Sequence, residues 1–178
     1  MIDHPISSVH FLFNQAEING DKSAFSYKDN QIWNDISWNT YRGDVHKAAG
    51  SLISIGCNSG DKVCILGFNN YNWVTMDMAA MMTGAIPAGI YETCSAEEIS
   101  YILNHSEAKV LLIEDTEQWQ KINEIRNDLK FLEKVILMEG CDEITDDLVI
   151  DWKSFMNLSN EDNRKAAFVS MGKLQKDD

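Results

Sequence analysis

The stretch from Lys62 to Tyr91, KVCILGFNNYNWVTMDMAAMMTGAIPAGIY, decides the fold because its hydrophobic pattern changes twice. Residues 62–68 form a near-continuous apolar run, which is typical of a strand buried on both faces of a parallel sheet. Residues 71–83 have the spacing of a helix that ends at Gly84, and residues 85–91 form a second apolar run. The stretch therefore predicts strand, helix and strand, the repeating unit of an α/β fold.

The same alternation continues toward the C-terminus. Ser95 and Glu98 have the spacing of a capping box, which predicts the start of another helix. Two more apolar runs, residues 109–115 and 134–139, flank a further helical segment. Because crossovers between parallel strands are right-handed, residues 62–139 predict an open, mostly parallel sheet wrapped by helices.

The residues before this region predict one more helix and a β-hairpin. Ser7 or Ser8 can cap a helix whose apolar side chains share one face. The segments AFSY and IWNDISW alternate like two strands of a hairpin that turns at residues 28–31. We expect Thr40 to cap the next helix, which runs to a left-handed turn at Gly56.

Composition narrows the possible functions. The chain has 178 residues, of which 44% are hydrophobic, enough for one domain with a substantial core. Its net charge of −13 disfavours binding to nucleic acid and to anionic lipid. The most apolar window, residues 73–91, contains Asp77 and Pro87, so it predicts a buried helix and strand and no transmembrane segment. The four cysteines have no CxxC spacing and are expected to be reduced thiols of a cytoplasmic protein.

Open α/β sheets bind ligands at the carboxyl ends of their strands. No G-x-G-x-x-G follows any predicted strand, and Gly172-Lys173 lacks the rest of a phosphate-binding loop. Tyr91, Thr93 and Ser95 form the best polar cluster, but capping already engages Ser95. The four histidines lie far apart in sequence and predict no shared site: His4, His10, His46, His105.

Two other groups are interpreted as structural. Tyr71, Trp73 and Met76 share one helix face, which is more typical of a core than of a cofactor site. The acidic segment 139–151 lacks the central glycine and closing glutamate of a calcium loop, so a solvated turn is expected. Its acidic residues are Glu139, Asp142, Glu143, Asp146, Asp147 and Asp151. The sequence thus predicts no catalytic, cofactor-binding or metal-binding residue.

Residues 60–115, together with TYRGDVHKAAGSLISIG at 40–56, resemble the N-terminal region of adenylate-forming enzymes, the AMP-dependent synthetase/ligase superfamily. GIYETCS at 89–95 and its spacing to VLLIED are similar to the long-chain branch, and most similar to bubblegum-type acyl-CoA synthetases. The resemblance spans residues 6–157. It implies the N-terminal subdomain of the acyl-CoA synthetase fold over 1–157, followed by a divergent segment over 158–178. The weak periodicity and charged finish of that segment predict a frayed tail.

Full-length members of that superfamily use ATP, Mg and CoA to convert a fatty acid to acyl-CoA, AMP and diphosphate. The resemblance places their phosphate loop, adenine site, ribose aspartate and catalytic lysine outside the matched segment, so this chain is expected to hold no cofactor. Two interpretations follow. The chain is the N-terminal portion of a long-chain fatty acid–CoA ligase, inactive alone, whose partner is the remainder of the synthetase. Alternatively, it is a non-catalytic interaction module that pairs with full-length synthetases. The resemblance also implies a cytoplasmic location, peripheral to membranes in the full-length family.

Overall fold

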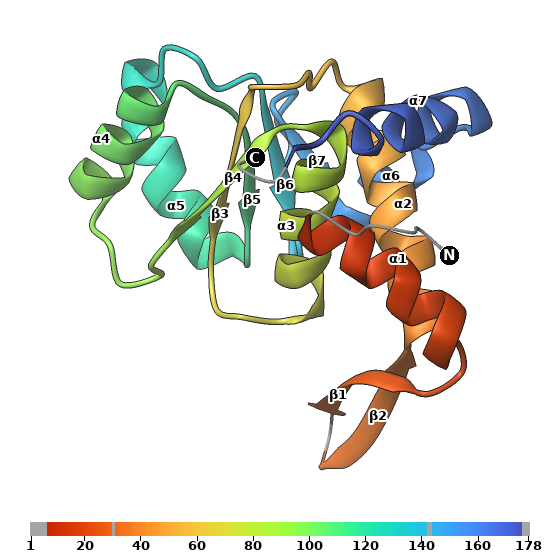
Figure 1. Cartoon of the computed structure of the whole chain (residues 1–178). Helices are drawn as coiled ribbons and strands as arrows, with labels where there is room; N and C mark the ends of the chain where they lie inside the picture. Colours follow the sequence, from red (N-terminus) through yellow and green to blue (C-terminus); the bar gives the residue numbers. More distant parts are fainter. Residues whose placement is uncertain (1–6, 30, 142–143, 176–178) are drawn as a thin grey trace.

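The computed structural model describes residues 7–29, 31–141 and 144–175. Its centre is a five-stranded parallel sheet with helices on both faces (Figure 1). The strand order is β4 (Ile86–Ile90), β3 (Lys62–Leu66), β5 (Ala108–Ile113), β6 (Lys134–Leu137) and β7 (Val149–Asp151). The predicted α/β class and parallel sheet are therefore confirmed.

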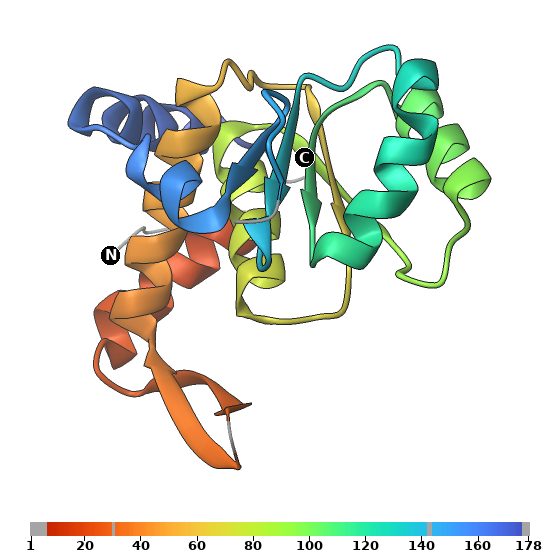
Figure 2. The same cartoon turned by 180° about the vertical axis from the view of Figure 1, so that it is seen from behind.

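Helices cover the two faces of this sheet unequally (Figures 1 and 2). One face carries α4 (Ala96–Ser106) and α5 (Thr116–Ile125), which continues into a short 3₁₀ turn, η1 (Arg126–Asp128). The other face carries a larger group: α1 (Ser8–Asn19), α2 (Trp38–Ser54), α3 (Tyr71–Thr83), α6 (Trp152–Asn157) and α7 (Glu161–Met171). Successive residues of β3 point to opposite faces, so the strands contribute to two separate cores.

Local signals fix where most helices begin and end. The Ser7 side chain caps α1, and Gly84 ends α3 in the left-handed conformation with φ of 80°, both as expected. The cap predicted for α2 is wrong by one turn. Ser37 accepts the N–H of Thr40 at 3.1 Å, because Trp38 is already helical and Thr40 lies inside the first turn.

The capping box of α4 is formed in full. The Ser95 hydroxyl accepts the N–H of Glu98 at 3.2 Å, and the Glu98 carboxylate accepts the N–H of Ser95 at 2.8 Å. The second bond favours the ionised carboxylate and lowers the pKa of Glu98. Ile99 follows in the next turn and is fully buried, which anchors the helix to the sheet.

Replacing Ser95 with alanine is expected to lower the free energy of unfolding by about 1 kcal/mol, because α4 loses a capping hydrogen bond. Urea denaturation of both proteins measures the change. Ser100→Ala, a substitution in the interior of the same helix, is the matched control. A denaturation midpoint equal to that of the unmodified chain would contradict the role assigned to Ser95.

The acidic segment contains a strand that the sequence pattern missed. Residues 149–151 form β7 and pair in parallel with β6, with Ile136 opposite Ile150. The strand is only three residues long, too short to show a period in the sequence. Asp151 caps α6 by accepting the N–H of Ser154 at 2.8 Å. The predicted turn is thus confined to the residues before 149, of which 142 and 143 lie outside the described residues.

The C-terminal segment folds onto the body, so the expectation of a frayed tail is wrong for the described residues. Residues 161–171 form α7, which Asn160 caps through the N–H of Asn163 at 2.9 Å. Ala167, Met171 and Leu174 are buried in the core that α2 and α3 share. The division of the chain at residue 157 stays a prediction.

The hairpin of β1 (Ser23–Asp29) and β2 (Ile32–Ser37) forms as expected, as a separate antiparallel sheet. It projects from the end of the molecule where the strands of the main sheet have their carboxyl ends (Figures 1 and 2). No helix among the described residues is long and apolar enough to cross a membrane. None of the four cysteines forms a disulfide in the described part of the chain.

Candidate functional site

The strand order defines the position at which a ligand would be expected. The strand β3 lies between β4 and β5 in the sheet. The helix that follows β3, α3, packs on one face of the sheet, and the helix that follows β5, α5, packs on the other. The connections after β3 and β5 therefore diverge at the carboxyl ends of these strands. This divergence is the topological switch point, where doubly wound sheets bind ligands.

A side chain of the protein itself fills the switch point. The Phe68 N–H donates to the Glu114 carboxylate, Oε2, at 2.9 Å, and this contact joins the segments that follow β3 and β5. Gly67 has a φ of 153°, and a Cβ there would lie 2.8 Å from the Glu114 Cβ. Any larger residue at position 67 would displace Glu114 or the strand end. This contact therefore joins the ends of β3 and β5 at the switch point.

Beside the switch point, on the β4 side, is an open hollow of about 510 Å³. Its walls are the segment after β3, the first turn of α3 and the end of β4. The Trp73 ring lies against the backbone of Gly89, where a Cβ would be 3.2 Å from Cζ2. Phe68 and Tyr91, the other aromatic residues of the lining, are 60% and 79% exposed. Such a surface suits stacking by a planar or apolar group.

Charged residues occur at both ends of the sheet. At the amino end, Lys62 and Lys134 begin strands β3 and β6, and Asp61 and Glu133 directly precede them. Acidic residues follow the carboxyl ends of β4, β5 and β6: Glu92, Glu114, Asp115 and Glu139. The lining of the hollow contains Glu92 and no cationic side chain. The lining of the hollow therefore offers no positive charge to a phosphate group.

The polar cluster predicted at the end of β4 is structural in part. Ser95 is engaged in the capping box, and Thr93 is exposed. The Lys121 ammonium donates to the carbonyl oxygens of Glu92 at 2.7 Å and of Cys94 at 3.2 Å, which holds this corner in shape. Of the predicted cluster, Tyr91 alone lines the hollow.

The histidines are not brought together. The His10 Nδ1 lies 2.7 Å from the Ser7 hydroxyl at the start of α1, and His46 contacts the carbonyl oxygen of Arg164 at 2.8 Å. His105 stacks on Tyr101 on the outer face of α4. His4 lies outside the described residues. No cluster of potential metal ligands occurs in the part of the chain that the structure describes.

Buried ionisable groups are held in their neutral forms. Burial raises the pKa of the Cys57 thiol to about 12 and also raises the pKa of Cys64, so neither thiol is a nucleophile near neutral pH. Burial, together with the bond from its hydroxyl to the Asp44 carboxylate at 2.8 Å, raises the pKa of Tyr71. The core interpretation therefore holds for Tyr71 and for the fully buried Met76.

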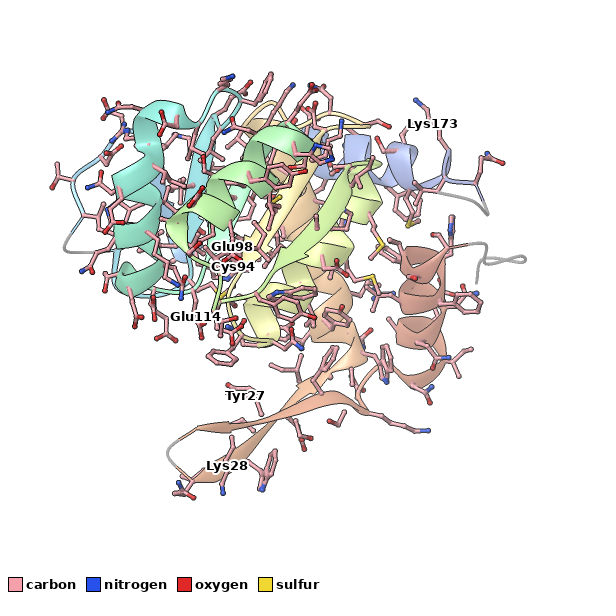
Figure 3. The ribbon with its side chains drawn as sticks, turned by 90° about the vertical axis from the view of Figure 1, so that its left-hand side faces the viewer. Tyr27, Lys28, Cys94, Glu98, Glu114 and Lys173 are labelled. Carbon is pink, nitrogen blue, oxygen red and sulfur yellow. The ribbon has the colours of Figure 1, made fainter. Side chains whose placement is uncertain are left out.

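Hydrogen bonds and an ion pair with neighbouring residues hold the acidic segment in place. Burial alone would raise the pKa of Asp146, but the Leu148 N–H and the paired Arg126 guanidinium outweigh it and lower that pKa. Lys134 donates to the carbonyl oxygen of Asp147 at 2.8 Å. Lys173, in the Gly-Lys pair considered above, follows α7 and lies on the other side of the molecule from Glu114 (Figure 3).

Two residues shape this end of the sheet beyond what the sequence predicts. Trp73 packs against the main core, as predicted, and its ring also borders the hollow. Glu114 lies within the apolar run 109–115, for which the sequence predicts no contact with β3. The signal available was the placement of both residues next to the carboxyl ends of strands, with glycines on the neighbouring strands. The contacts themselves depend on which strands are neighbours.

The AMP-binding enzyme family model matches residues 12–169. Among curated relatives, the long-chain-fatty-acid–CoA ligase ACSBG2 of Xenopus laevis is 32% identical over 161 residues, covering 88% of this chain and 21% of that relative. The human ACSBG2 is 30% identical over 154 residues, covering 86% of this chain and 23% of that relative. The chain thus spans less than a quarter of the length of these relatives.

Solved structures show the same fold. The anthranilate CoA ligase AuaEII, in complex with anthranoyl-AMP, matches with a TM-score of 0.77 at 21% identity, over 88% of this chain and 29% of that one. The acetoacetyl-CoA synthetase of Streptomyces lividans matches with a TM-score of 0.76 at 20% identity, over 86% and 25%. The chain belongs to the AMP-binding enzyme family, and its curated relatives are bubblegum-type long-chain acyl-CoA ligases.

Proposed function

We propose that this chain is the N-terminal portion of a long-chain fatty acid–CoA ligase. The observation that supports this is the combination of a family match over residues 12–169 with identities of 30–32% to long-chain ligases. The complete reaction joins a fatty acid carboxylate to the α-phosphorus of ATP with release of diphosphate. The CoA thiol then attacks the acyl carbonyl, and AMP leaves.

The role proposed for this chain is structural. Its sheet supplies a rigid α/β layer, and the hollow at its carboxyl end is lined by aromatic side chains and Glu92, with no cationic side chain for ATP phosphates. ATP, Mg and CoA would be bound through other parts of the complete enzyme. Because the lining of the hollow contains no cationic side chain, and Lys121 beside it donates to the carbonyl oxygens of Glu92 and Cys94, we propose that the chain alone does not catalyse the reaction.

A chimeric enzyme tests this assignment. Residues 12–169 replace the matched segment of the Xenopus laevis ACSBG2, and palmitoyl-CoA formation is measured with ATP and CoA. We expect formation well above that of the ACSBG2 deleted for the segment, because the chain restores the missing layer. A chimera that melts cooperatively and activates a short-chain acid but not palmitate would contradict the long-chain assignment.

The alternative function is an interaction module that pairs with full-length synthetases and performs no chemistry. The observation that favours pairing is the projecting hairpin, which carries exposed apolar side chains. Peripheral association with membranes, as implied for the full-length family, is likewise a property proposed for the complete enzyme.

A further inference from the structure

The hairpin of β1 and β2 forms a sheet of two strands only. A two-stranded sheet is marginally stable in water unless it packs against other structure. Support comes from the body at its base, where the Phe25 ring packs against Tyr41 at 4.7 Å and Tyr71 at 6.2 Å between ring centres. The outer part of the hairpin extends beyond these contacts (Figure 1).

The register shows that an apolar face continues into this outer part. Phe25 lies opposite Ile36, and both pack against the main core. Because side chains alternate along a strand, Tyr27 and Ile32 lie on the same face, farther from the body. They are 45% and 66% exposed. Figure 3 shows Tyr27 on the side of the hairpin that faces the body and Lys28 on the opposite side.

The opposite face of the hairpin also carries a large apolar group. Trp33 lies opposite Lys28 and is 67% exposed. Three large apolar side chains are therefore exposed within one short hairpin: Tyr27, Ile32 and Trp33. We call these the hairpin apolar group. Tyr27 and Ile32 lie on one face and Trp33 on the other, so a partner that covers this group would contact both faces of the hairpin. Large apolar side chains that are exposed together mark interaction surfaces.

The edges of the two sheets differ in how well they are protected against pairing with an additional strand. In the main sheet, β4 is an edge strand, and the Ile86 N–H donates inward to the Asp61 carbonyl at 2.8 Å. By alternation, Pro87 points outward, where it removes a donor and blocks pairing with another strand. The hairpin has no proline between residues 23 and 37. Its strands pair only with each other among the described residues, so their outer edges are open to an added strand.

We propose that the hairpin is the docking element for the part of an AMP-binding enzyme that lies outside the matched segment, which adds a strand to it. Main-chain hydrogen bonds of the added strand would extend the sheet, and the hairpin apolar group would enter pockets of the partner. This inference rests on the proposed function, which identifies the partner as the remainder of the ligase.

Two observations favour this occupant over a second copy of the chain. The matched segment makes up 21% of the Xenopus laevis relative, so in that relative most of the polypeptide lies outside this segment and is available to cover it. A second copy would bring another net charge of −13 to the interface, which opposes self-association. The partner surface is therefore expected to be a sheet edge that is neutral or basic.

Co-expression tests the docking. The tagged chain is produced together with the Xenopus laevis ACSBG2 deleted for its matched segment, and the partner recovered with the tag is quantified. The test variant is Ile32→Ser combined with Trp33→Ser, and Tyr27→Ser is a second test variant. Tyr101→Ser is the matched control, because Tyr101 is also 67% exposed but lies on α4. Thermal melts of each chain alone establish that all variants fold.

We expect the hairpin variants to reduce recovery of the partner by at least about tenfold, whereas Tyr101→Ser changes it less than about twofold. Hydrogen exchange of the amides in residues 23–37 should slow in the complex. The inference is overturned if no partner is recovered, if folded hairpin variants recover it undiminished, or if the hairpin instead mediates a homodimer in light scattering. A complex without palmitoyl-CoA formation would contradict the proposed function alone, whereas an active chimera without docking in trans would contradict this inference alone.

Discussion

The isolated 178-residue chain is expected to release no diphosphate from ATP in the presence of palmitate and CoA. Adenylate formation requires cationic groups placed where negative charge develops on the phosphates, and removing even one such donor typically lowers kcat by about 10²–10³. In this chain Glu92, Glu114 and Asp115 follow the carboxyl ends of β4 and β5, and Lys121 at the same corner is engaged by the carbonyl oxygens of Glu92 and Cys94. The lining of the hollow therefore offers no cationic group to the phosphates.

A coupled assay for diphosphate release measures this directly. The complete Xenopus laevis ACSBG2 is the positive control, and material from cells with an empty vector sets the background. Turnover that elutes with the 20.2 kDa chain and exceeds this background would show that the chain holds a phosphate site of its own.

The parallel sheet could be predicted because its signals are local. Residues 62–66 and 108–113 are buried on both faces, and each reads as one apolar run in the sequence. Gly84 and Ser95 mark helix ends through conformational needs that only a few residue types meet. These signals depend only on residues that are close in the sequence, so they can be recognised without knowledge of the fold.

The elements that were missed depend on distant partners. The strand β7 has three residues, and β6 gives it its hydrogen bonds. The helix α7 has weak amphipathic spacing, because Ala167 and Met171 are its only buried residues and the surface that covers them belongs to α2 and α3. The polar contact of Ser51 with the Met156 carbonyl, at 3.3 Å, likewise joins α2 to α6 across 105 positions.

The position of the candidate site could be predicted from the sequence, but the contacts between its residues could not. Parallel strands bring their carboxyl ends to one edge, so Phe68 and Tyr91 were expected there from the strand pattern. The strand order decides that Trp73 meets Gly89 and that Glu114 meets Gly67. That order results from which helices pack on which face. The chemical character of the edge, aromatic and acidic, follows from these long-range contacts.

The largest effect on stability is expected at Phe155, in the short helix α6. This side chain is fully buried in the core that also contains Leu52 and Met76. Replacing Phe155 with alanine removes its contacts and leaves a cavity between α2 and the sheet, which costs about 3–5 kcal/mol in comparable cores. A loss of that size is a large fraction of the stability of a typical domain, so we expect a measurable fraction of the variant to be unfolded even without denaturant.

Urea denaturation of the variant, with Phe11→Ala as the control, checks this expectation. Phe11 is 55% exposed on α1, so its replacement should shift the midpoint little. Equal urea midpoints for the Phe155 and Phe11 variants would contradict this expectation. They would mean that the C-terminal helices pack on the surface of the domain and do not form part of its core. The expected difference would instead show that residues beyond 151 are an integral part of the fold, because one side chain from α6 is needed to fill the space that α2 and the sheet leave between them.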